Sequence, residues 1–330
     1  MKKMLAILLA AMMLLSLAAC GGGNADATDA AGADAPAADK FVVGVCQLTP
    51  HVALDAATQG FVDRLTELLG EENVEIKVQV AAGDSATCAP IVTDFVAQEV
   101  DLIMANATPA LQAAAAATAD IPILGTSVTE YGVAMGIENF DGTVGGNISG
   151  TSDLAPLDQQ AAMIQEWFPD AKTVGLLYCS AEPNSQYQVD TVMAYLTEMG
   201  YACTLYPFAD SNDMAAVTTQ AAENSDVIYV PTDNTVAGAT GIVDGICQSA
   251  GIPVVAGEEG ICAGCGVATL SISYYDLGVK TAEMAAQILK GEADVSTMAI
   301  AYADNFSPKY NAAICEALGI TPMEGYAPIE

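Results

Sequence analysis

Short polar motifs follow several apolar runs of this chain, and their side chains are suited to binding. The clearest is Pro-Thr-Asp-Asn at 231–234, where Asp233 and Asn234 follow the apolar run 226–230. These two side chains could cap a helix, hold a ligand, or do both, because caps and ligand sites share helix starts. Hydroxyl and amide groups stand in comparable places elsewhere, namely at Gln47, Thr108, Thr126, Ser127, Ser152, Asn184 and Ser185. Such groups offer hydrogen bonds to an anion, and Asp233 offers a carboxylate to a cation.

Catalytic machinery is sparse. His51 is the sole histidine, and no G-x-S-x-G, H-E-x-x-H or phosphate-loop pattern occurs. Cys262 and Cys265 have redox or metal spacing, but one such pair with one histidine falls short of a zinc site. We expect no enzyme, no cofactor and no metal. A thiol oxidoreductase or a local disulfide at Cys262/Cys265 remains the alternative to simple packing.

The first twenty residues have the pattern of an export signal: Lys2 and Lys3, an apolar run, then small residues before Cys20. Leu-Ala-Ala-Cys at 17–20 resembles the bacterial lipobox, whose cysteine is diacylated and becomes the first residue after cleavage. We therefore expect a lipoprotein signal peptide at 1–20, lipid attachment at Cys20, and a flexible linker at 21–40. The mature protein would be lipid-anchored at the extracytoplasmic face of the cell membrane.

Charge and cysteine usage limit the partners. With 41 acidic and nine basic residues, the chain has a formal net charge of −32. Nucleic acid and anionic lipid headgroups are therefore excluded as partners. The eight cysteines besides Cys20 lie partly within apolar runs, and a chain of this size needs no disulfide staples, so we expect mostly free thiols.

Apolar runs alternate with amphipathic segments from residue 41. Strands are predicted at 41–47, 74–80, 101–105 and 121–126, with helices at about 54–69, 87–98 and 109–118 between them. The second half repeats the order, with strands at 172–179, 202–208, 226–230 and 252–257 and helices near 185–199, 212–222 and 235–250. This order predicts an α/β protein with parallel sheets in two Rossmann-like lobes.

The two halves can be aligned. "DLIMANATPA" matches "DVIYVPTDNT", which places Asp233 on Thr108, itself expected to cap a helix with Pro109 at its first position. Ligands of parallel sheets bind beyond the carboxyl ends of the strands, so facing lobes predict a site across a cleft. The glycine-rich stretch 141–156 is typical of a hinge.

The motifs "VGVCQLTPHVALDAATQGF", "NATPALQAAAAATADIPI", "NISGTSDLAP", "AEPNSQYQ", "VPTDNTV" and "SYYDLGVKTAEMAAQIL" together resemble the substrate-binding lipoproteins of ABC transporters of the tryptophan/tyrosine type. The resemblance implies a type I periplasmic-binding fold with about three crossings between the lobes. It implies a first lobe at 41–150 plus about 268–300, and a second at about 151–267 plus about 301–330. It also implies an amino-acid ligand, aromatic favoured, delivered to an ABC permease and its ATPase. The sequence departs from the family at "GEEGICAGCG" and at Thr49-Pro50.

An amino acid needs donors for its carboxylate, an acceptor for its ammonium and an apolar wall. The sole arginine, Arg64, lies within a predicted helix, so we expect hydroxyls and helix starts to hold the carboxylate and Asp233 to hold the ammonium. Further candidates, each with a structural alternative, are Asp153 in the crossing segment, Glu182, His51, Tyr274 and Tyr275 as an aromatic wall, and Glu258 and Glu259, which would otherwise be solvated. Another ligand, a nucleoside or a sugar, and a sensory receptor remain alternatives; Trp167, the only tryptophan, lies in a predicted helix and disfavours a sugar.

Overall fold

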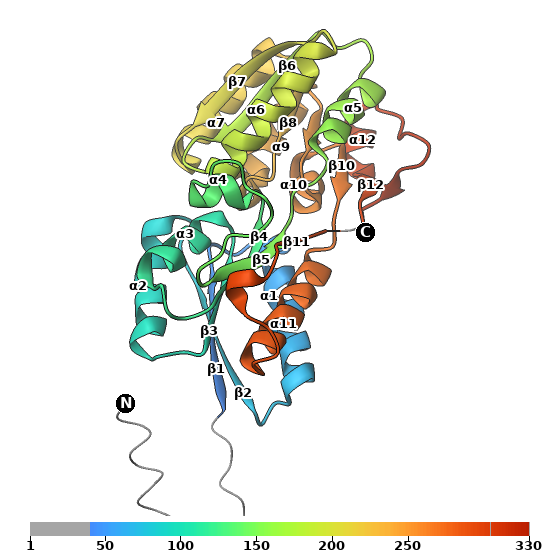
Figure 1. The fold of residues 1–330 in the computed structure, drawn as a ribbon. Helices are drawn as coiled ribbons and strands as arrows, with labels where there is room; N and C mark the ends of the chain where they lie inside the picture. The colour runs from blue at the N-terminus through green and yellow to red at the C-terminus, as the bar shows by residue number, and fades with distance from the viewer. Residues whose placement is uncertain (1–39, 304, 330) are drawn as a thin grey trace, which may run out of the picture. The chain divides into compact units, whose positions relative to one another are not determined.

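The computed structural model describes residues 40–303 and 305–329, which form two lobes, each built around one sheet (Figure 1). The signal peptide, Cys20 and nearly all of the linker lie outside the described residues. The first sheet contains β1 (Phe41–Gln47), β2 (Val74–Val80), β3 (Leu102–Asn106), β4 (Ile123–Val128), β5 (Ile148–Ser152) and β11 (Ala301–Tyr302). Its strands are all parallel, in the order β11-β5-β4-β3-β1-β2.

The second sheet has the order β13-β12-β10-β9-β8-β6-β7 and is parallel except where β12 meets β10. Its strands are β6 (Thr173–Cys179), β7 (Ala202–Phe208), β8 (Val227–Val230), β9 (Val254–Ala256), β10 (Ala268–Ser271), β12 (Ser307–Tyr310) and β13 (Ala327–Pro328). The order β2-β1-β3-β4-β5 in one lobe is repeated as β7-β6-β8-β9-β10 in the other. The prediction of two parallel α/β lobes in a type I periplasmic-binding architecture is confirmed.

Helices cover both faces of each sheet. In the first lobe α1 (Val52–Leu69) and α11 (Tyr274–Leu289) pack on one face, and α2 (Ser85–Ala97) and α3 (Thr108–Ala117) on the other. In the second lobe α5 (Leu157–Trp167), α6 (Pro183–Glu198) and α12 (Ala312–Leu318) face α7 (Ser211–Asn224), α9 (Thr240–Ala250) and α10 (Glu259–Cys265) across the sheet. Between two such layers a parallel strand is buried on both faces, which explains continuous apolar runs such as that of β3.

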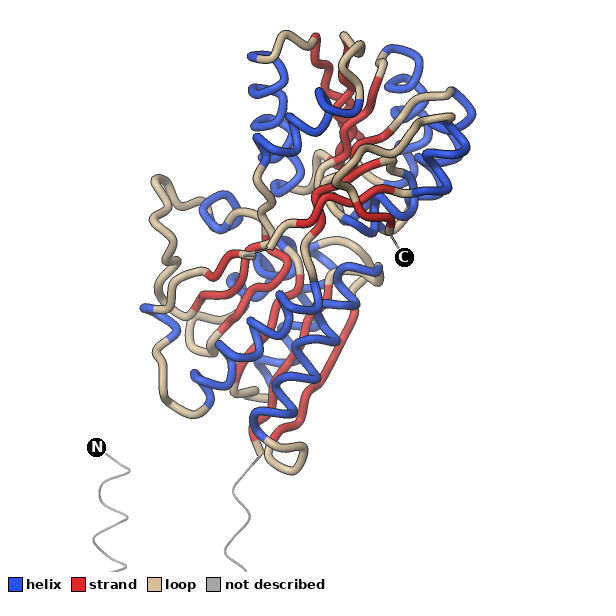
Figure 2. Tube along the Cα trace, turned by 90° about the vertical axis from the view of Figure 1, so that its right-hand side faces the viewer, coloured by secondary structure: helices blue, strands red, loops and turns tan. Residues whose placement is uncertain are grey.

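Three segments join the lobes, and they are seen from another side in Figure 2. They lie between β5 and α5, between β10 and α11, and between β11 and β12. The expected lobe boundaries are therefore a few residues early, because β5 runs to Ser152 in the first lobe and β10 at 268–271 belongs to the second. The expected hinge at 141–156 is also too long, since its middle forms β5 and only 153–156 crosses.

Local differences from the predicted elements have local causes. The helix expected at 235–250 is two helices, α8 (Asn234–Ala237) and α9, separated at Gly238 and Ala239. Glycine disfavours a helix interior, and Ala239 takes a non-helical backbone conformation. The short helix α4 (Tyr131–Met135) and a 3-10 turn at Val295–Thr297 were not predicted. Among the described residues no helix is long and apolar enough to cross a membrane.

The first lobe depends on close packing of α1 against α11 through two glycines. A Cβ added to Gly278 would lie 2.0 Å from the carbonyl oxygen of Ala57, and one on Gly60 would lie 2.1 Å from that of Tyr275. We predict that Gly278→Ala lowers the free energy of unfolding by about 2 kcal/mol, because the helices must move apart.

The matched control is Gly241→Ala in α9, where an added Cβ meets nothing within 4 Å. It should raise stability by about 0.5 kcal/mol, since alanine is the better helix former. Urea unfolding of both variants measures the two changes; an unchanged midpoint for Gly278→Ala would contradict the packing described.

Candidate functional site

A small cavity lies between the lobes where the carboxyl ends of both sheets meet. Its free volume is about 10 Å³, which is room for about one water molecule. It is lined by His51, Leu54, Ser127, Thr129, Asp153, Asn184, Thr232, Asp233, Asn234, Ala237, Glu258 and Tyr274. Both lobes contribute side chains, together with Asp153 in the first crossing and Tyr274 directly after the second. A ligand larger than water can enter only if the lobes part or side chains move.

Three buried polar atoms of residues lining this cavity have no hydrogen-bond partner within the described part of the chain. They are Ser127 Oγ, Asp153 Oδ1 and Asn184 Oδ1, on side chains that are 6%, 3% and 4% exposed respectively. Buried polar atoms are nearly always paired in folded proteins, and each unpaired one costs about 1–3 kcal/mol. Three unpaired polar atoms around one cavity, referred to below as the orphaned atoms, therefore indicate a place where a polar ligand supplies the missing hydrogen bonds.

Asp153 joins two of the crossings. It directly follows β5, and its Oδ2 accepts a hydrogen bond of 2.9 Å from the hydroxyl of Tyr274, the first residue of α11. Burial raises the pKa of Asp153, while the bond from Tyr274 acts in the opposite direction. The carboxylate thus stands at the hinge with one oxygen held and the other facing the cavity.

Ser127 is placed by an irregularity in β4. The pairing of β4 with β5 shifts register between Gly125 and Val128, and Ser127 has φ of 53°, in the left-handed region. A bulge of this kind redirects a side chain, and a left-handed serine costs about 1 kcal/mol or more. Strain at a residue whose hydroxyl is also unpaired is typical of a binding position.

We predict that Ser127→Gly weakens ligand binding by about tenfold while leaving stability unchanged or slightly higher. The variant loses one hydrogen bond to the ligand, worth about 1 kcal/mol, but removes both the backbone strain and the orphaned hydroxyl. Asn139→Gly is the matched control, because Asn139 has the same φ of 53° and is exposed outside the cavity. Calorimetric titration and thermal unfolding of both variants test this prediction. Equal effects of Ser127→Gly and Asn139→Gly on affinity would show that Ser127 does not contact the ligand.

Asp233 lines the cavity, but both of its oxygens already accept backbone hydrogen bonds. Oδ1 accepts from Val236 at 2.9 Å, which makes Asp233 the N-cap of α8, and Oδ2 accepts from Cys179 at the end of β6 at 2.7 Å. Burial, and then the nearby Glu182 carboxylate, raise its pKa. The cap that the sequence allowed is therefore present, together with a second bond that ties α8 to β6.

Asn234 contacts both lobes. Its Oδ1 lies 3.2 Å from Nε2 of His51, the N-cap residue of α1, and its Nδ2 donates to Glu182 at 2.6 Å. Glu182 is only 4% exposed and also accepts from the backbone N–H groups of Asn234 and Thr235. Burial lowers the pKa of His51. Asn234 thus lies where the two lobes meet, and Glu182, for which no anchoring role was predicted, holds the start of α8.

Glu258 is a third buried carboxylate on the cavity, which excludes the alternative that it is solvated. It caps α10 by accepting from Gly260 and Ile261, and burial raises its pKa from 4.5 to about 7. Because the folded protein then binds more protons than the unfolded chain between about pH 4.5 and 7, this group's contribution to stability is lost as pH rises through that window.

We predict that Glu258→Gln makes stability less dependent on pH than in the wild type. Between pH 5 and pH 8 the free energy of unfolding should fall by on the order of 1 kcal/mol less in the variant. The pKa values of Asp153 and Asp233 are also raised, so these two groups still make the free energy of unfolding of the variant fall as pH rises. Glu316→Gln, at an exposed position of α12, is the control. Denaturant unfolding at both pH values measures the difference. An equal fall in the free energy of unfolding for Glu258→Gln and the wild type would contradict the prediction.

Five of the seven hydroxyl and amide candidates named first do not line this cavity. Gln47 bonds within the first lobe to Thr49, Asp55 and Thr58. Thr126 bonds to Thr151 in the core, and the Ser152 hydroxyl donates to the carbonyl of Thr129. Ser185, fully buried, lies beside Asn184. Thr108 is the first residue of α3 and not its cap; Ala107 holds the capping position, without a side-chain cap bond.

Two larger cavities adjoin the central one. One of about 370 Å³ shares Asn234 with it and opens between the starts of α2 and α7. The other, of about 620 Å³, shares Glu258 and Tyr274 and includes Tyr275 and the ion pair of Lys309 with Glu259. Tyr274 is therefore a wall between cavities, while Tyr275 is 41% exposed and bonds to Asp63. Space for a ligand side chain is present on either side of the central cavity.

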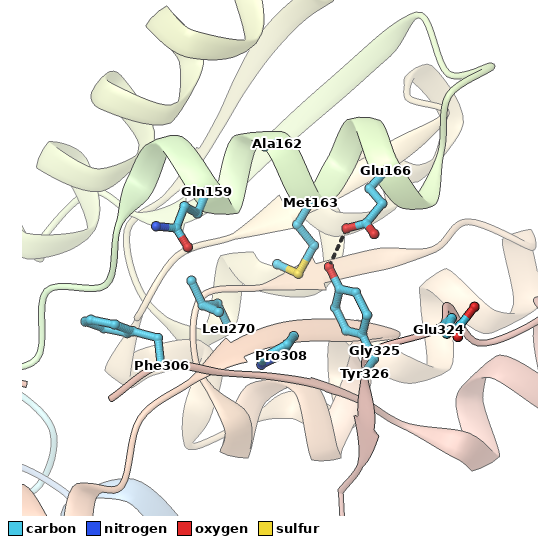
Figure 3. Close-up of a pocket in the computed structure, with 10 residues that line it drawn as sticks. All are labelled: Gln159, Ala162, Met163, Glu166, Leu270, Phe306, Pro308, Glu324, Gly325 and Tyr326. Carbon is cyan, nitrogen blue, oxygen red and sulfur yellow. Dashed lines mark hydrogen bonds between the residues drawn. The ribbon is translucent and has the colours of Figure 1, made fainter. Parts of the chain in front are cut away.

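A further groove, of about 540 Å³, is lined by the second lobe and by Phe306 of the crossing between β11 and β12 (Figure 3). Tyr326 donates a hydrogen bond of 2.8 Å to Glu166 across it, and its ring lies edge-on to Trp167. None of the residues shown in Figure 3 has a buried polar atom without a hydrogen-bond partner, so this groove lacks the unpaired atoms found at the central cavity. Trp167 therefore packs within this lobe.

The Cys262/Cys265 pair does not have the features of a reactive site. All eight cysteines that the structure describes are thiols, and Cys262 and Cys265 are buried in α10 with pKa values raised by burial. A raised pKa keeps a thiol protonated and a poor nucleophile, which argues against a thiol oxidoreductase. Within the described residues no group of three or more potential ligands is arranged to hold a metal ion.

A family model described as "ABC transporter substrate binding protein" matches residues 42–326. The chain belongs to this family. The substrate-binding protein is similar to a tyrosine-binding protein of Clostridioides difficile (strain R20291), at 33% identity over 298 residues, 88% of this chain and 85% of the relative. Homologues of this kind bind substrates and are not enzymes.

Two solved structures of other proteins are similar to the substrate-binding protein. One is an ABC domain from Streptococcus pneumonia in complex with L-Trp, with a TM-score of 0.84 at 31% identity, covering 88% of this chain and 100% of that chain. The other is a ligand-free, open substrate-binding protein with adhesive properties from Clostridium difficile, with a TM-score of 0.67 at 37% identity, covering 88% and 99%. The more similar sequence thus has the less similar structure.

Proposed function

We propose that the protein is an extracytoplasmic lipoprotein that captures an amino acid, aromatic favoured, between its lobes and delivers it to an ABC permease and its ATPase. The observation that carries the proposal is the set of three unpaired buried atoms, Ser127 Oγ, Asp153 Oδ1 and Asn184 Oδ1, around one interlobe cavity. Support for an aromatic side chain comes from the relatives, one named for tyrosine and one bound to L-Trp.

The geometry gives the ligand a way to control closure. Ser127 belongs to the first lobe, Asn184 to the second, and Asp153 to a crossing. A ligand that bonds to all three makes those contacts together only when the lobes are closed, so it shifts the equilibrium toward the closed state. A permease can then distinguish the loaded protein from the empty one by the arrangement of its lobes.

A thermal-shift screen of the mature protein against the twenty amino acids, nucleosides and sugars tests the ligand class. We expect the largest rise in melting temperature with tyrosine or tryptophan, since a ligand that binds only the folded state stabilises it. A rise with a sugar or nucleoside and with no amino acid would overturn the proposal.

Lipid attachment is tested separately. In cells fed labelled palmitate, the wild type should be labelled and found with the membrane, and Cys20→Ala should lose both properties. Labelling that persists in Cys20→Ala would place the lipid elsewhere. Delivery to the permease is tested by the uptake of labelled tyrosine in cells with and without the gene. We expect lower uptake without the gene, and equal uptake would contradict the proposed delivery.

A further inference from the structure

The three orphaned atoms of the cavity are best satisfied by a group that donates. Asp153 Oδ1 is an acceptor only, and Ser127 Oγ can accept as well as donate. The side-chain amide of Asn184 is fixed in orientation, because its Nδ2 donates to Glu182 at 3.2 Å and to the carbonyl of Thr232 at 3.1 Å. Its Oδ1 therefore faces the cavity as an acceptor. An ammonium group has three N–H donors, one for each orphan.

The charges around the cavity favour the same group. Asp153, Asp233 and Glu258 are buried carboxylates on its wall, and none of its lining residues among those described is lysine or arginine. His51, the remaining ionisable base on the wall, has its pKa lowered by burial. A cation entering here stabilises the charged form of these carboxylates, whose pKa values are raised by burial, whereas an anion meets no counter-charge.

In the second lobe, the helix starts at the cavity, those of α8 and α10, are already occupied by the protein's own carboxylates. Glu182 takes the N–H groups of Asn234 and Thr235, and Asp233 takes that of Val236, all at the start of α8. Glu258 takes those of Gly260 and Ile261 at the start of α10. Backbone donors of this kind are the usual substitute for an arginine in holding an anion. The second lobe therefore has few of them left for a ligand carboxylate.

We infer that the ammonium group is the principal polar determinant of binding, so that the cleft also binds aromatic primary amines that lack the carboxylate of the amino acid. The inference rests on the proposed function and widens its ligand class from aromatic amino acids to aromatic primary amines. The ammonium donates to Ser127 Oγ, Asp153 Oδ1 and Asn184 Oδ1, and the aromatic ring enters one of the adjoining cavities when the lobes part.

Calorimetric titration of the mature protein with three compounds that share one ring tests the inference. They are L-tyrosine, tyramine, which lacks the carboxylate, and 3-(4-hydroxyphenyl)propionic acid, which lacks the ammonium. We expect the tyramine affinity to lie within about tenfold of that of tyrosine, and the acid to bind at least about 100-fold more weakly than tyrosine, as for the loss of a buried charged partner. Tryptophan and tryptamine repeat the comparison with a larger ring.

The outcomes separate the inference from the function on which it rests. Tight binding of tyrosine with binding of tyramine weaker by 100-fold or more would overturn the inference and leave the proposed function standing. Failure of both amino acids to bind would overturn the proposed function, and the inference with it. Asp153→Asn should weaken tyrosine and tyramine by the same factor, whereas exposed Asp158→Asn should change neither; an effect on tyrosine alone would show that Asp153 does not act through the ammonium.

Discussion

Asp153→Asn is expected to weaken binding of the amino acid by about 100-fold or more without lowering the stability of the empty protein. Removing one partner of a buried, hydrogen-bonded charge pair costs about 2–5 kcal/mol of binding free energy. Asparagine keeps the shape and an acceptor for the Tyr274 hydroxyl. In the empty protein the carboxylate is buried without a cation, and burial raises its pKa, so a neutral amide is tolerated equally well or better.

Affinity is measured by calorimetric titration with tyrosine or tryptophan, and stability by urea unfolding without ligand. The control is Asp158→Asn, five residues further along the chain and exposed in the first turn of α5. It should leave both quantities unchanged. A drop in unfolding free energy with affinity retained would show that Asp153 only fastens the hinge.

Asp233→Ala is expected to lower the free energy of unfolding by about 2–4 kcal/mol. Its two oxygens accept from the buried N–H groups of Cys179 and Val236, and an unsatisfied buried donor costs about 1–3 kcal/mol. Relief of a buried carboxylate whose pKa is raised offsets part of that cost. Affinity should fall as well, because α8 carries Asn234 on the cavity wall.

The matched control is Asp210→Ala, which removes the exposed N-cap of α7 with its single bond to Asn212. Its cost should be about 1 kcal/mol, typical of a lost cap. Urea unfolding compares the two variants. If Asp233→Ala has the unfolding free energy of the wild type but no longer binds the ligand, the main role of Asp233 is ligand binding and not helix capping.

The fold was largely predictable because its signals are local and repeated. The bounds of β1, β2 and β7 coincide with the predicted strands. The repeated order of strands and helices in the two halves of the chain was enough to predict two lobes. The break between α8 and α9 was harder to predict, since an apolar pattern continues across Gly238. The ends of the lobes depend on pairing between distant strands, such as β11 with β5, which no local pattern specifies.

The site was less predictable, because residue type and position near a strand end do not show whether a side chain bonds to the protein itself or stays available to a ligand. Asp233 and Asp153 are both acidic residues after a strand. The first meets two backbone N–H groups, whereas the second keeps one oxygen unpaired. Gln47 ends β1 as expected, whereas Thr126 lies inside β4 and does not end it; in both cases neighbouring side chains of the folded lobe satisfy the polar group. The bulge that exposes Ser127 to the cavity has no sequence signal in β4.

A crystal structure of the protein with L-tyrosine tests the central claim most directly. We predict that the ligand nitrogen lies within about 3.2 Å of Asp153 Oδ1, Asn184 Oδ1 and Ser127 Oγ, with the lobes closed around it. A ligand carboxylate at that position, or tyrosine bound away from these three atoms, would contradict the account.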